Sequence, residues 1–274
     1  MAYRYRAKVC QRVQRDRLII CKEAYGRCRV RMRRDESMQA RGRGHVAAVI
    51  AAAGRGTRMD LDINKQYIEI HGMPILAMTI SKFEECSFID EIIVVANKDE
   101  IDYCRKNVIE RFGFTKIRSV TEGGDSRQRS VYNGLKQVSA GCGIVLIHDG
   151  ARPFVSNDSI IECIEAAGKY GAACVAVPAK DTIKESDADG FVIRTLDRSS
   201  LWQIQTPQAF AYEMIMDAHS RAARDMFEAT DDAMLAEKYG HRVRLVMGGY
   251  SNIKVTTKED LAFAEVLFRR QHGN

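Results

Sequence analysis

A glycine-rich turn at residues 54–56 comes before two basic residues, and this combination is suited to binding phosphate groups. The turn follows the apolar run VAAVIAAA at residues 46–53. Gly54 and Gly56 allow backbone N–H groups to approach phosphate oxygens where a Cβ atom would collide. Arg58 and Lys65 can neutralise charge that develops on a phosphorus atom under attack. The stretch therefore predicts a site for a nucleoside triphosphate, although the glycines alone would also suit an ordinary surface turn.

Two better-known glycine loops do not fit this turn. A P-loop requires G-x-x-x-x-G-K-[ST], but here the second glycine comes two residues after the first and no Lys-Ser or Lys-Thr pair follows. A dinucleotide fingerprint requires a third glycine or an alanine at the position that Met59 occupies. The phosphate site is therefore expected to belong to neither class.

Two further segments have residues that could complete such a site. EGGDSRQRSVYNGLK, which begins at Glu122, contains a Gly-Gly turn, and Asp125 or Ser126 can cap a helix that begins near Arg127. HDGARPF, which begins at residue 148, presents Asp149 and Arg152 after an apolar run. A helix N-terminus attracts phosphate, and Asp149 could pair with a divalent cation or with Lys65. Each segment taken singly would also fit a capped turn or a solvated loop.

The last chemical signals lie near the C-terminus. ATDDAML surrounds Thr230, and GGYSNIKVTTKEDL places Lys254 on a short extended segment before a helix that Thr257 would cap. A lysine in this setting is usually an ordinary surface residue. Lys254 becomes a candidate site residue only when it is considered together with the other segments.

The elements that must position these residues alternate between apolar runs and amphipathic stretches. Strands are expected at residues 46–51, 91–96, 117–121, 144–148, 172–177 and 243–247. Helices are expected at residues 74–85, 99–112, 127–138 and 156–168. Near-continuous Val/Ile strands with helices between them predict an α/β fold with one doubly wound, mostly parallel sheet. Ligands should gather at the carboxyl ends of its strands.

Residues 181–210 break this alternation. An Asp-Ala-Asp-Gly turn joins two extended runs, which predicts a protruding β-hairpin at about 181–196 with an apolar side formed by Val192, Ile193 and Leu196. An isolated hairpin is only marginally stable in water. We therefore expect an arm at about 181–206 that packs against its equivalent in a homodimer and places Arg198, Trp202 and Thr206 near a shared site.

Residues 1–44 differ in composition from residues 45–274. They hold 14 Lys and Arg against 4 Asp and Glu, whereas the remainder holds 28 against 32. No helical or strand periodicity is present, so we expect a disordered extension. Clustered arginines could contact nucleic acid, but a non-functional extension is favoured because Met38 would serve as an initiator before the first strand of the 45–274 domain.

The cysteines indicate a reducing compartment. None of the eight forms a C-x-x-C pair, so neither a disulfide framework nor a metal site built on the cysteines is expected. No apolar run approaches the roughly 20 residues that a membrane span needs, and no secretory signal is present. A cytoplasmic location is therefore expected.

Taken in order, seven segments closely resemble the 2-C-methyl-D-erythritol 4-phosphate cytidylyltransferases over about residues 46–270. They are AAGRGTRM, NKQY, GGDSRQRSV, HDGARP, DTIK, LDRSSLWQIQTPQ and SNIKVTT. The resemblance implies a Rossmann-like nucleotidyltransferase, a homodimer with interlocking hairpin arms, and CTP and methylerythritol phosphate as substrates. It also implies that Arg58 and Lys65 stabilise the transition state. Arg198 and Lys254 would hold the acceptor phosphate for attack.

The resemblance also implies two sets of binding residues. CTP would be surrounded by Ala52, Ala53, Gly54, Gly56, Gly124, Asp125, Ser130, Asp149 and Gly150. Methylerythritol phosphate would be contacted by Asp149, Arg152, Thr182, Arg198, Thr206 and Lys254. The departures are small: Asn64 stands where many members have Pro, and Gly150 where some have Ala. The N-terminal extension has no counterpart.

The implied reaction needs no general base, because a phosphate monoester is already ionised at neutral pH. Positioning and charge stabilisation, with Mg²⁺ as the expected cofactor, would carry the catalysis. Mg²⁺ would be held mainly by the CTP phosphates, with Asp149 as the candidate protein ligand. One alternative is a cytidylyltransferase for a pentitol phosphate such as ribitol 5-phosphate, which the DRSSLW segment disfavours. Another is an inactive transferase body that acts as a scaffold or binds nucleic acid.

Overall fold

The computed structural model describes residues 19–21, 29–31, 44–54 and 64–272. Residues 1–43 and 44–274 form two separate units. In the first unit, strands β1 (Ile19–Cys21) and β2 (Arg29–Arg31) pair antiparallel. The predicted disorder of the rest of this unit falls outside the described residues and stays a prediction.

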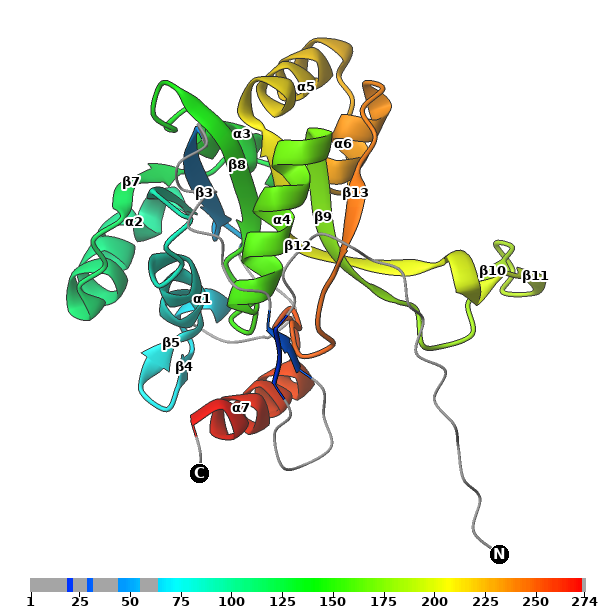
Figure 1. Cartoon of the computed structure of the whole chain (residues 1–274), viewed down its shortest axis with the longest axis horizontal. Coiled ribbons are helices and arrows are strands. Elements are labelled where there is room, and N and C mark those ends of the chain that lie inside the picture. The colour runs from blue at the N-terminus through cyan, green and yellow to red at the C-terminus, as the bar shows by residue number, and fades with distance from the viewer. Residues whose placement is uncertain (1–18, 22–28, 32–43, 55–63, 273–274) are drawn as a thin grey trace, which may run out of the picture. The chain divides into compact units, whose positions relative to one another are not determined.

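The second unit is built on a seven-stranded sheet in the order β13-β9-β12-β8-β3-β6-β7 (Figure 1). All neighbouring pairs are parallel except those that β12 makes with β8 and β9. The strands are β3 (His45–Ala51), β6 (Glu91–Ala96), β7 (Ile117–Glu122), β8 (Cys142–Asp149), β9 (Ala172–Pro178), β12 (Trp202–Ala211) and β13 (Arg244–Met247). The predicted mostly parallel α/β sheet is thus confirmed.

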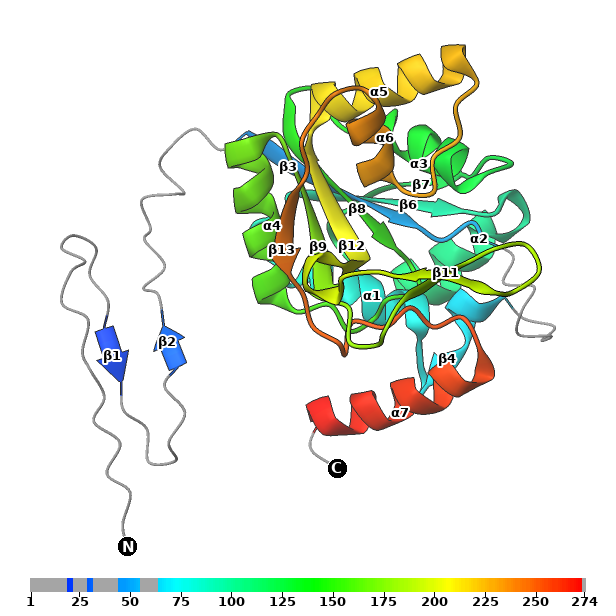
Figure 2. The ribbon, with the colours of Figure 1, turned by 90° about the vertical axis from the view of Figure 1, so that its right-hand side faces the viewer.

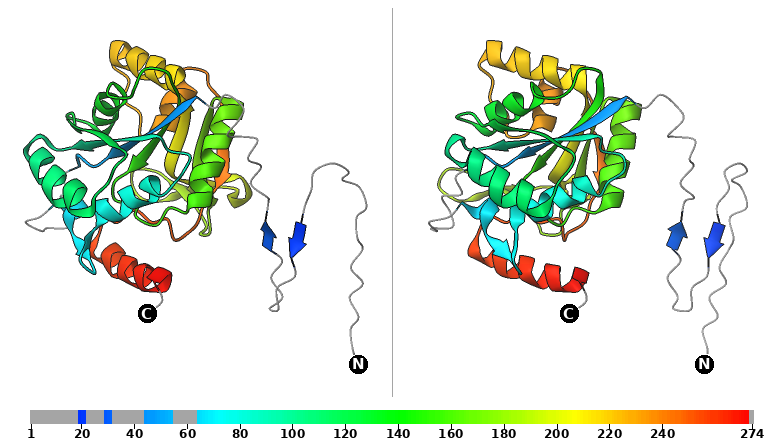
Figure 3. Two further views of the ribbon diagram at one scale, coloured as in Figure 1. Left: turned by 60° about the vertical axis from the view of Figure 1, so that its left-hand side comes forward. Right: turned by 90° about the vertical axis from the view of Figure 1, so that its left-hand side faces the viewer.

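Helices cover both faces of this sheet because successive side chains of its strands point to opposite sides. In β3, Val46, Ala48 and Ile50 pack under α1 (Ile75–Glu84) and α4 (Asn157–Tyr170). Ala47 and Val49 pack against the helices of the other face. Those helices are α3 (Arg127–Leu135), α5 (Tyr212–Asp225) and α6 (Asp232–Lys238). Figures 2 and 3 show the sheet between these two layers.

Most predicted elements are found with their ends shifted by a few residues. The helix expected at 99–112 is irregular: a 3₁₀ turn at Lys98–Glu100 leads into α2 (Ile101–Cys104) and then into a π-helical segment at Arg105–Glu110. Strand β12 was not predicted, and it contains Pro207, which cannot donate a ladder hydrogen bond. The sheet accommodates Pro207 by interrupting the pairing of β12 with β9 between Ile204 and Gln208.

The predicted hairpin is present. Strands β10 (Lys184–Ser186) and β11 (Val192–Thr195) pair antiparallel and project away from the sheet (Figure 1). Since β12 begins at Trp202, the arm range of about 181–206 overlaps the central sheet by its last residues.

A third apolar cluster lies beside the two main layers. It joins α7 (Lys258–His272) to α1 and to a small hairpin of β4 (Glu69–Ile70) and β5 (Met73–Pro74). The helix predicted after Thr257 is confirmed as α7. Across the described part of the chain, no helix combines the length and the apolar character that crossing a membrane requires.

Candidate active site

A cavity of about 710 Å³ opens where β3, β7 and β8 end, as expected for the carboxyl edge of a parallel sheet. Its volume lies within the usual range for small-molecule sites. Most of its wall is formed by residues 51–54, 97–99 and 122–127 together with Asp149 and Ala151. Of the residues predicted to act in the site, the cavity is lined by Ala52, Ala53, Gly54, Lys65, Gly124, Asp125, Ser130, Asp149 and Lys254.

The first glycine turn leaves β3 at the cavity edge. The N–H group of Ala52 donates to the Val95 carbonyl over 2.8 Å, which ties the start of the turn to β6. Gly54 is the last described residue before a gap at 55–63. Arg58 and Gly56 therefore lie outside the described residues, and their predicted roles stay predictions.

Lys65 begins a short 3₁₀ helix, Lys65–Tyr67, whose neighbours hold it at the cavity. The Gln66 side chain is buried and donates to the Ala52 carbonyl over 2.9 Å and to the Glu100 carboxylate over 3.2 Å. Asn64 also donates to Glu100. Lys65 is thus flanked by two side chains that share one acceptor, the Glu100 carboxylate.

The second glycine turn leads directly into α3. Ser126 is the N-cap and accepts from the Arg129 N–H over 3.1 Å, which confirms one of the two predicted caps. The Ser130 hydroxyl accepts from the Gly124 N–H over 2.9 Å and fixes the turn. A Cβ atom on Gly123 would lie 2.4 Å from the Ala53 Cβ, so only glycine lets the two loops approach this closely. The two predicted phosphate loops therefore form one continuous wall.

Asp149 stands at the centre of a cationic cluster. Its Oδ2 lies 2.9 Å from the Lys254 Nζ and 3.3 Å from the Arg152 Nε, and its Oδ1 lies 3.5 Å from the Arg127 Nε. Burial alone would raise the pKa of Asp149, but these three cations hold it well below its usual range. Asp149 is therefore ionised at neutral pH, and its cluster carries excess positive charge toward the cavity.

Arg152 and Thr206 support Asp149 and are not among the residues that line the cavity. Arg152 donates to the Asn252 carbonyl over 2.8 Å, and the Thr206 hydroxyl accepts from the Asp149 N–H over 3.1 Å. The same hydroxyl lies 3.0 Å from the His148 Nδ1. Burial lowers the pKa of His148 to about 4, so this imidazole is neutral at pH 7.

Thr182 and Arg198 are not brought into this cavity by their own chain. Both are exposed and lie on either side of the hairpin. Arg198 begins the 3₁₀ turn Arg198–Ser200 and donates to the Lys180 carbonyl over 2.6 Å. Gly150 lies behind the first loop, where an added Cβ would come within 2.9 Å of the Ala52 Cβ.

Three residues of the network were not predicted. Arg127 lines the cavity, its Nη1 donates to the Asp232 Oδ2 over 2.8 Å, and Asp232 also contacts buried His219. ATDDAML marked the segment that contains Asp232. Arg127 and Asp232 are 105 residues apart in the sequence, so no local pattern could predict their contact.

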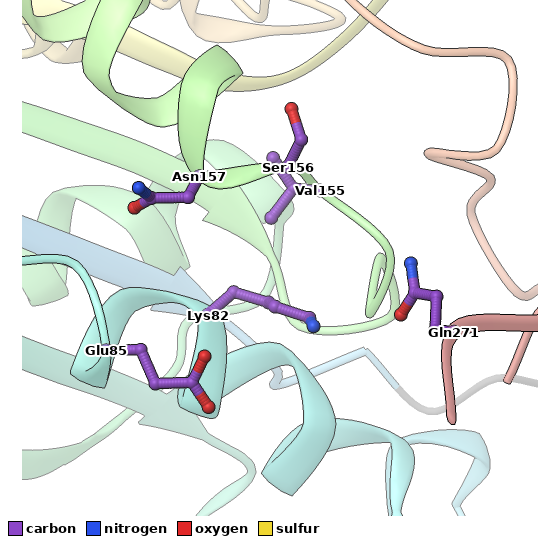
Figure 4. Close-up of a pocket in the computed structure, with 6 residues that line it drawn as sticks. All are labelled: Lys82, Glu85, Val155, Ser156, Asn157 and Gln271. Atoms are coloured by element: carbon purple, nitrogen blue, oxygen red, sulfur yellow. The ribbon is translucent and has the colours of Figure 1, made fainter. Parts of the chain in front are cut away.

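A second cavity of about 300 Å³ lies apart from this site, between α1, the start of α4 and the end of α7 (Figure 4). It is lined by Lys82, Glu85, Val155, Ser156, Asn157 and Gln271. None of the predicted site residues is among them. The predicted site residues that line a cavity therefore line the larger one.

The comparisons with known proteins agree with this geometry. The sequence pattern of the 2-C-methyl-D-erythritol 4-phosphate cytidylyltransferase family matches residues 46–270. A protein of that name from Caldanaerobacter subterraneus subsp. tengcongensis is 50% identical over 226 residues, which cover 82% of this chain and 100% of the relative. Another from Pelotomaculum thermopropionicum is 47% identical over 228 residues, covering 83% and 96%.

Solved structures give the same result. The 4-diphosphocytidyl-2C-methyl-D-erythritol synthase of Anaerococcus prevotii is similar with a TM-score of 0.74 and 37% identity, over 82% of this chain and 96% of that one. The 2-C-methyl-D-erythritol 4-phosphate cytidylyltransferase of Thermus thermophilus has a TM-score of 0.68 and 32% identity, covering 82% and 99%. With its sheet, its two adjoining glycine loops and its cationic wall, this chain belongs to the 2-C-methyl-D-erythritol 4-phosphate cytidylyltransferase family of nucleotidyltransferases.

Proposed function

We propose that this protein transfers CMP from CTP to 2-C-methyl-D-erythritol 4-phosphate, giving CDP-methylerythritol and pyrophosphate for non-mevalonate isoprenoid biosynthesis. The observation that carries the proposal is the cavity in which two glycine loops face Lys65 and the cations around Asp149. The family membership and the relatives' names support the choice of substrates.

The proposed reaction is a single displacement at phosphorus. A phosphate oxygen of the acceptor attacks the α-phosphorus of CTP, and the bond from that phosphorus to the departing pyrophosphate breaks. The acceptor is already ionised, so the site needs positive charge and alignment, not a base. Lys65 and Lys254 both line the cavity and would supply ammonium groups, and Arg58 is proposed to join them.

Mg²⁺ is the proposed cofactor, and when bound with the nucleotide it would neutralise phosphate charge. In the part of the chain that the structure describes, no group of three or more His, Cys, Asp or Glu side chains could hold a metal ion. Asp149 already has both carboxylate oxygens in ion pairs with Lys254, Arg152 and Arg127. Its carboxylate would have to release a cation to bind the metal, so the phosphates of CTP are proposed as the main ligands.

The acceptor half of the site is proposed to need a second copy of the chain. Thr182 and Arg198 are exposed beside a hairpin that carries apolar side chains into solvent. Phe191, Val192 and Ile193 are each more than half exposed, which a stable monomer would avoid. A homodimer in which the arms exchange would bury these side chains and bring Thr182 to the partner's cavity.

A cytoplasmic location is proposed as well. Cys86, Cys104, Cys142, Cys163 and Cys174 are free thiols and buried, which suits a reducing compartment. No role in nucleic-acid binding is proposed for the body of the protein.

The function is tested by pyrophosphate release from CTP with two acceptors, 2-C-methyl-D-erythritol 4-phosphate and ribitol 5-phosphate. Release only with the first, or with a kcat/KM at least about a hundredfold higher, is expected. Preference for ribitol 5-phosphate would transfer the protein to the pentitol class. No release with either acceptor, from a folded protein supplied with Mg²⁺, would support the scaffold alternative.

A further inference from the structure

Asp232 lies beneath the wall of the cavity, in a segment to which the proposed reaction gives no role. It is the first residue of α6, and its side chain is only 2% exposed. Its Oδ2 accepts from the Arg127 Nη1 over 2.8 Å, and its Oδ1 lies 3.3 Å from the Nε2 of His219. The His219 ring stacks on Tyr132 with an interplanar angle of 3°. Each carboxylate oxygen of Asp232 therefore has its own contact, Oδ2 with Arg127 and Oδ1 with His219.

Arg127 connects this buried acid to the cavity. It is the first residue of α3, directly after the glycine loop, and it lines the cavity. Its Nη1 binds Asp232, while its Nε lies 3.5 Å from the Asp149 Oδ1. A guanidinium is planar, so a contact at each of these nitrogens fixes the orientation of the whole group. Asp232 and Asp149 together set the direction in which the remaining N–H groups of Arg127 point.

The segment that carries Asp232 is itself fixed to the sheet. Asp231 caps α6 by accepting from the Met234 N–H over 2.8 Å. Gln208 of β12 donates to the Asp231 Oδ2 over 2.8 Å and accepts from the Ala233 N–H over 2.9 Å. These contacts leave Asp232 little freedom to follow Arg127 if the arginine moves. Asp232 is thus a fixed anchor and Arg127 the group that it restrains.

The loss of this anchor would change the cavity wall. Arg127 could then turn toward Asp149 and bind both of its oxygens, because arginine and carboxylate prefer a paired contact. That arrangement would compete with the 2.9 Å contact between Lys254 and the Asp149 Oδ2. The charges lining the site would remain, but their directions would differ. Asp232 therefore affects the cavity through Arg127, without reaching the ligand itself.

We propose that Asp232 is a positioning residue for CTP, acting by holding the Arg127 guanidinium in the direction that the bound nucleotide requires. This inference rests on the proposed function for the identity of the nucleotide. It also goes beyond that function, because it gives the ATDDAML segment a role in ligand binding as well as in packing.

The test measures CTP binding by calorimetry with Mg²⁺ and without any acceptor, for four proteins. These are the wild type, Asp232→Asn, Arg127→Gln and the double variant. Asp232→Asn keeps the shape of the side chain but weakens its hold on Arg127, and it should raise the Kd for CTP about tenfold, as expected for coupled groups in one network. In the Arg127→Gln background, the same substitution should change the Kd by less than about twofold. A purely structural role for Asp232 would not produce this dependence on Arg127.

Asp231→Asn is the matched control, because it changes the neighbouring acid, which contacts Gln208 and Met234 and not the Arg127 guanidinium. It should lower the melting temperature and leave the Kd for CTP within about twofold of the wild type. The proposal is overturned if folded Asp232→Asn binds CTP as the wild type does, or if the two substitutions at 127 and 232 multiply in their effects. If Asp232→Asn does not fold, the double variant decides, since removing both charges leaves neither one buried alone. Weaker CTP binding by the double variant than by Arg127→Gln then contradicts the proposal.

This design separates the proposal from the proposed function. A wild-type protein that binds CTP but turns over no acceptor contradicts the function and leaves the role of Asp232 open to the same measurement. A folded wild-type protein that does not bind CTP contradicts both.

Discussion

The wall around Asp149 and the hairpin of β10 and β11 are built in opposite ways. The Asp149 carboxylate is about 10% exposed and has three cationic partners within its own chain. On the hairpin, Phe191, Val192 and Ile193 are 72%, 60% and 59% exposed. The first region pairs its buried charges within the chain, whereas the second leaves apolar side chains exposed to water. One chain therefore holds a cavity wall whose charges are paired within the chain and a hairpin whose apolar side chains are not covered by it.

The contrast follows from the cost of each kind of exposure. An ionised carboxylate can be buried only with paired charges and hydrogen bonds, so this wall must be complete before any ligand arrives. A two-stranded hairpin has no core of its own and gains stability from whatever it packs against. We expect changes in the cavity to affect the chemistry and changes near the arm to affect recognition of the acceptor.

Replacing Lys65 with Ala should produce the largest effect and tests the cavity side of the contrast. One preorganised donor that faces transition-state charge typically contributes a factor of about 10² to 10³ in kcat. Lys65→Ala and, by the family resemblance, Arg58→Ala should each lower kcat by that amount in a pyrophosphate-release assay. The assigned role is wrong if kcat stays within about tenfold of the wild type.

Arg198→Ala should have the next largest effect and tests the arm side. Arg198 is exposed beside the hairpin and does not line its own chain's cavity. Loss of a charged hydrogen bond to the acceptor phosphate should raise the KM for methylerythritol phosphate about 10- to 100-fold. The KM for CTP should not change. A parallel loss of CTP affinity would mean that Arg198 belongs to the nucleotide half of the site.

The pH dependence of stability tests how completely the cavity region is buried. The pKa of His148 is lowered to about 4, whereas its unfolded value is about 6.5, so the unfolded chain binds more protons between these two values. Stability from this group is complete above about pH 6.5 and decreases as the pH falls toward 4. Lowering the pH from 7 to 5 should cost about 2 kcal/mol of unfolding free energy through His148. Urea unfolding at both pH values measures this cost.

His148→Gln serves as the control for this measurement, because it removes the titrating group and should flatten the dependence on pH. An equal slope in the variant and the wild type would assign the pH sensitivity to other groups.

The smallest expected effect is that of the N-terminal extension. The family match begins at residue 46, and residues 44–274 form a unit separate from residues 1–43. Deleting residues 1–37 should therefore leave kcat, the melting temperature and dimerisation unchanged within error. Activity that disappears with these residues would show that the extension takes part in the working enzyme.

Local patterns in the sequence predicted much of the fold. The apolar runs that became β3, β6 and β9 are buried along their whole central length, and such runs are typical of parallel strands covered on both faces. Strand β12 could not be predicted in this way, because Pro207 interrupts its pairing. No prediction covers α5 and α6, although α5 has apolar residues at helical spacing.

The same difference between local sequence signals and long-range packing applies to the candidate site. The glycine loops and Asp149 carry local signals, and they meet because the strands before them end at one edge of the sheet. The contact between Arg127 and Asp232 depends on the packing of α3 near α6, which no single segment encodes. The proposed roles of Thr182 and Arg198 involve a second chain, and both residues are exposed in the single subunit.

The proposal that the partner's arm completes the cavity is tested most directly by mixing two single variants. These are Thr182→Ala on the arm and Arg152→Ala beside Asp149. Each variant should be strongly impaired alone, and mixing with confirmed subunit exchange should restore about a quarter of wild-type turnover, because half of the dimers are mixed and each has one intact site. That result is the one we predict for a cavity completed by the partner's arm. No recovery despite complete exchange would contradict the account, since the site would then be built from a single chain.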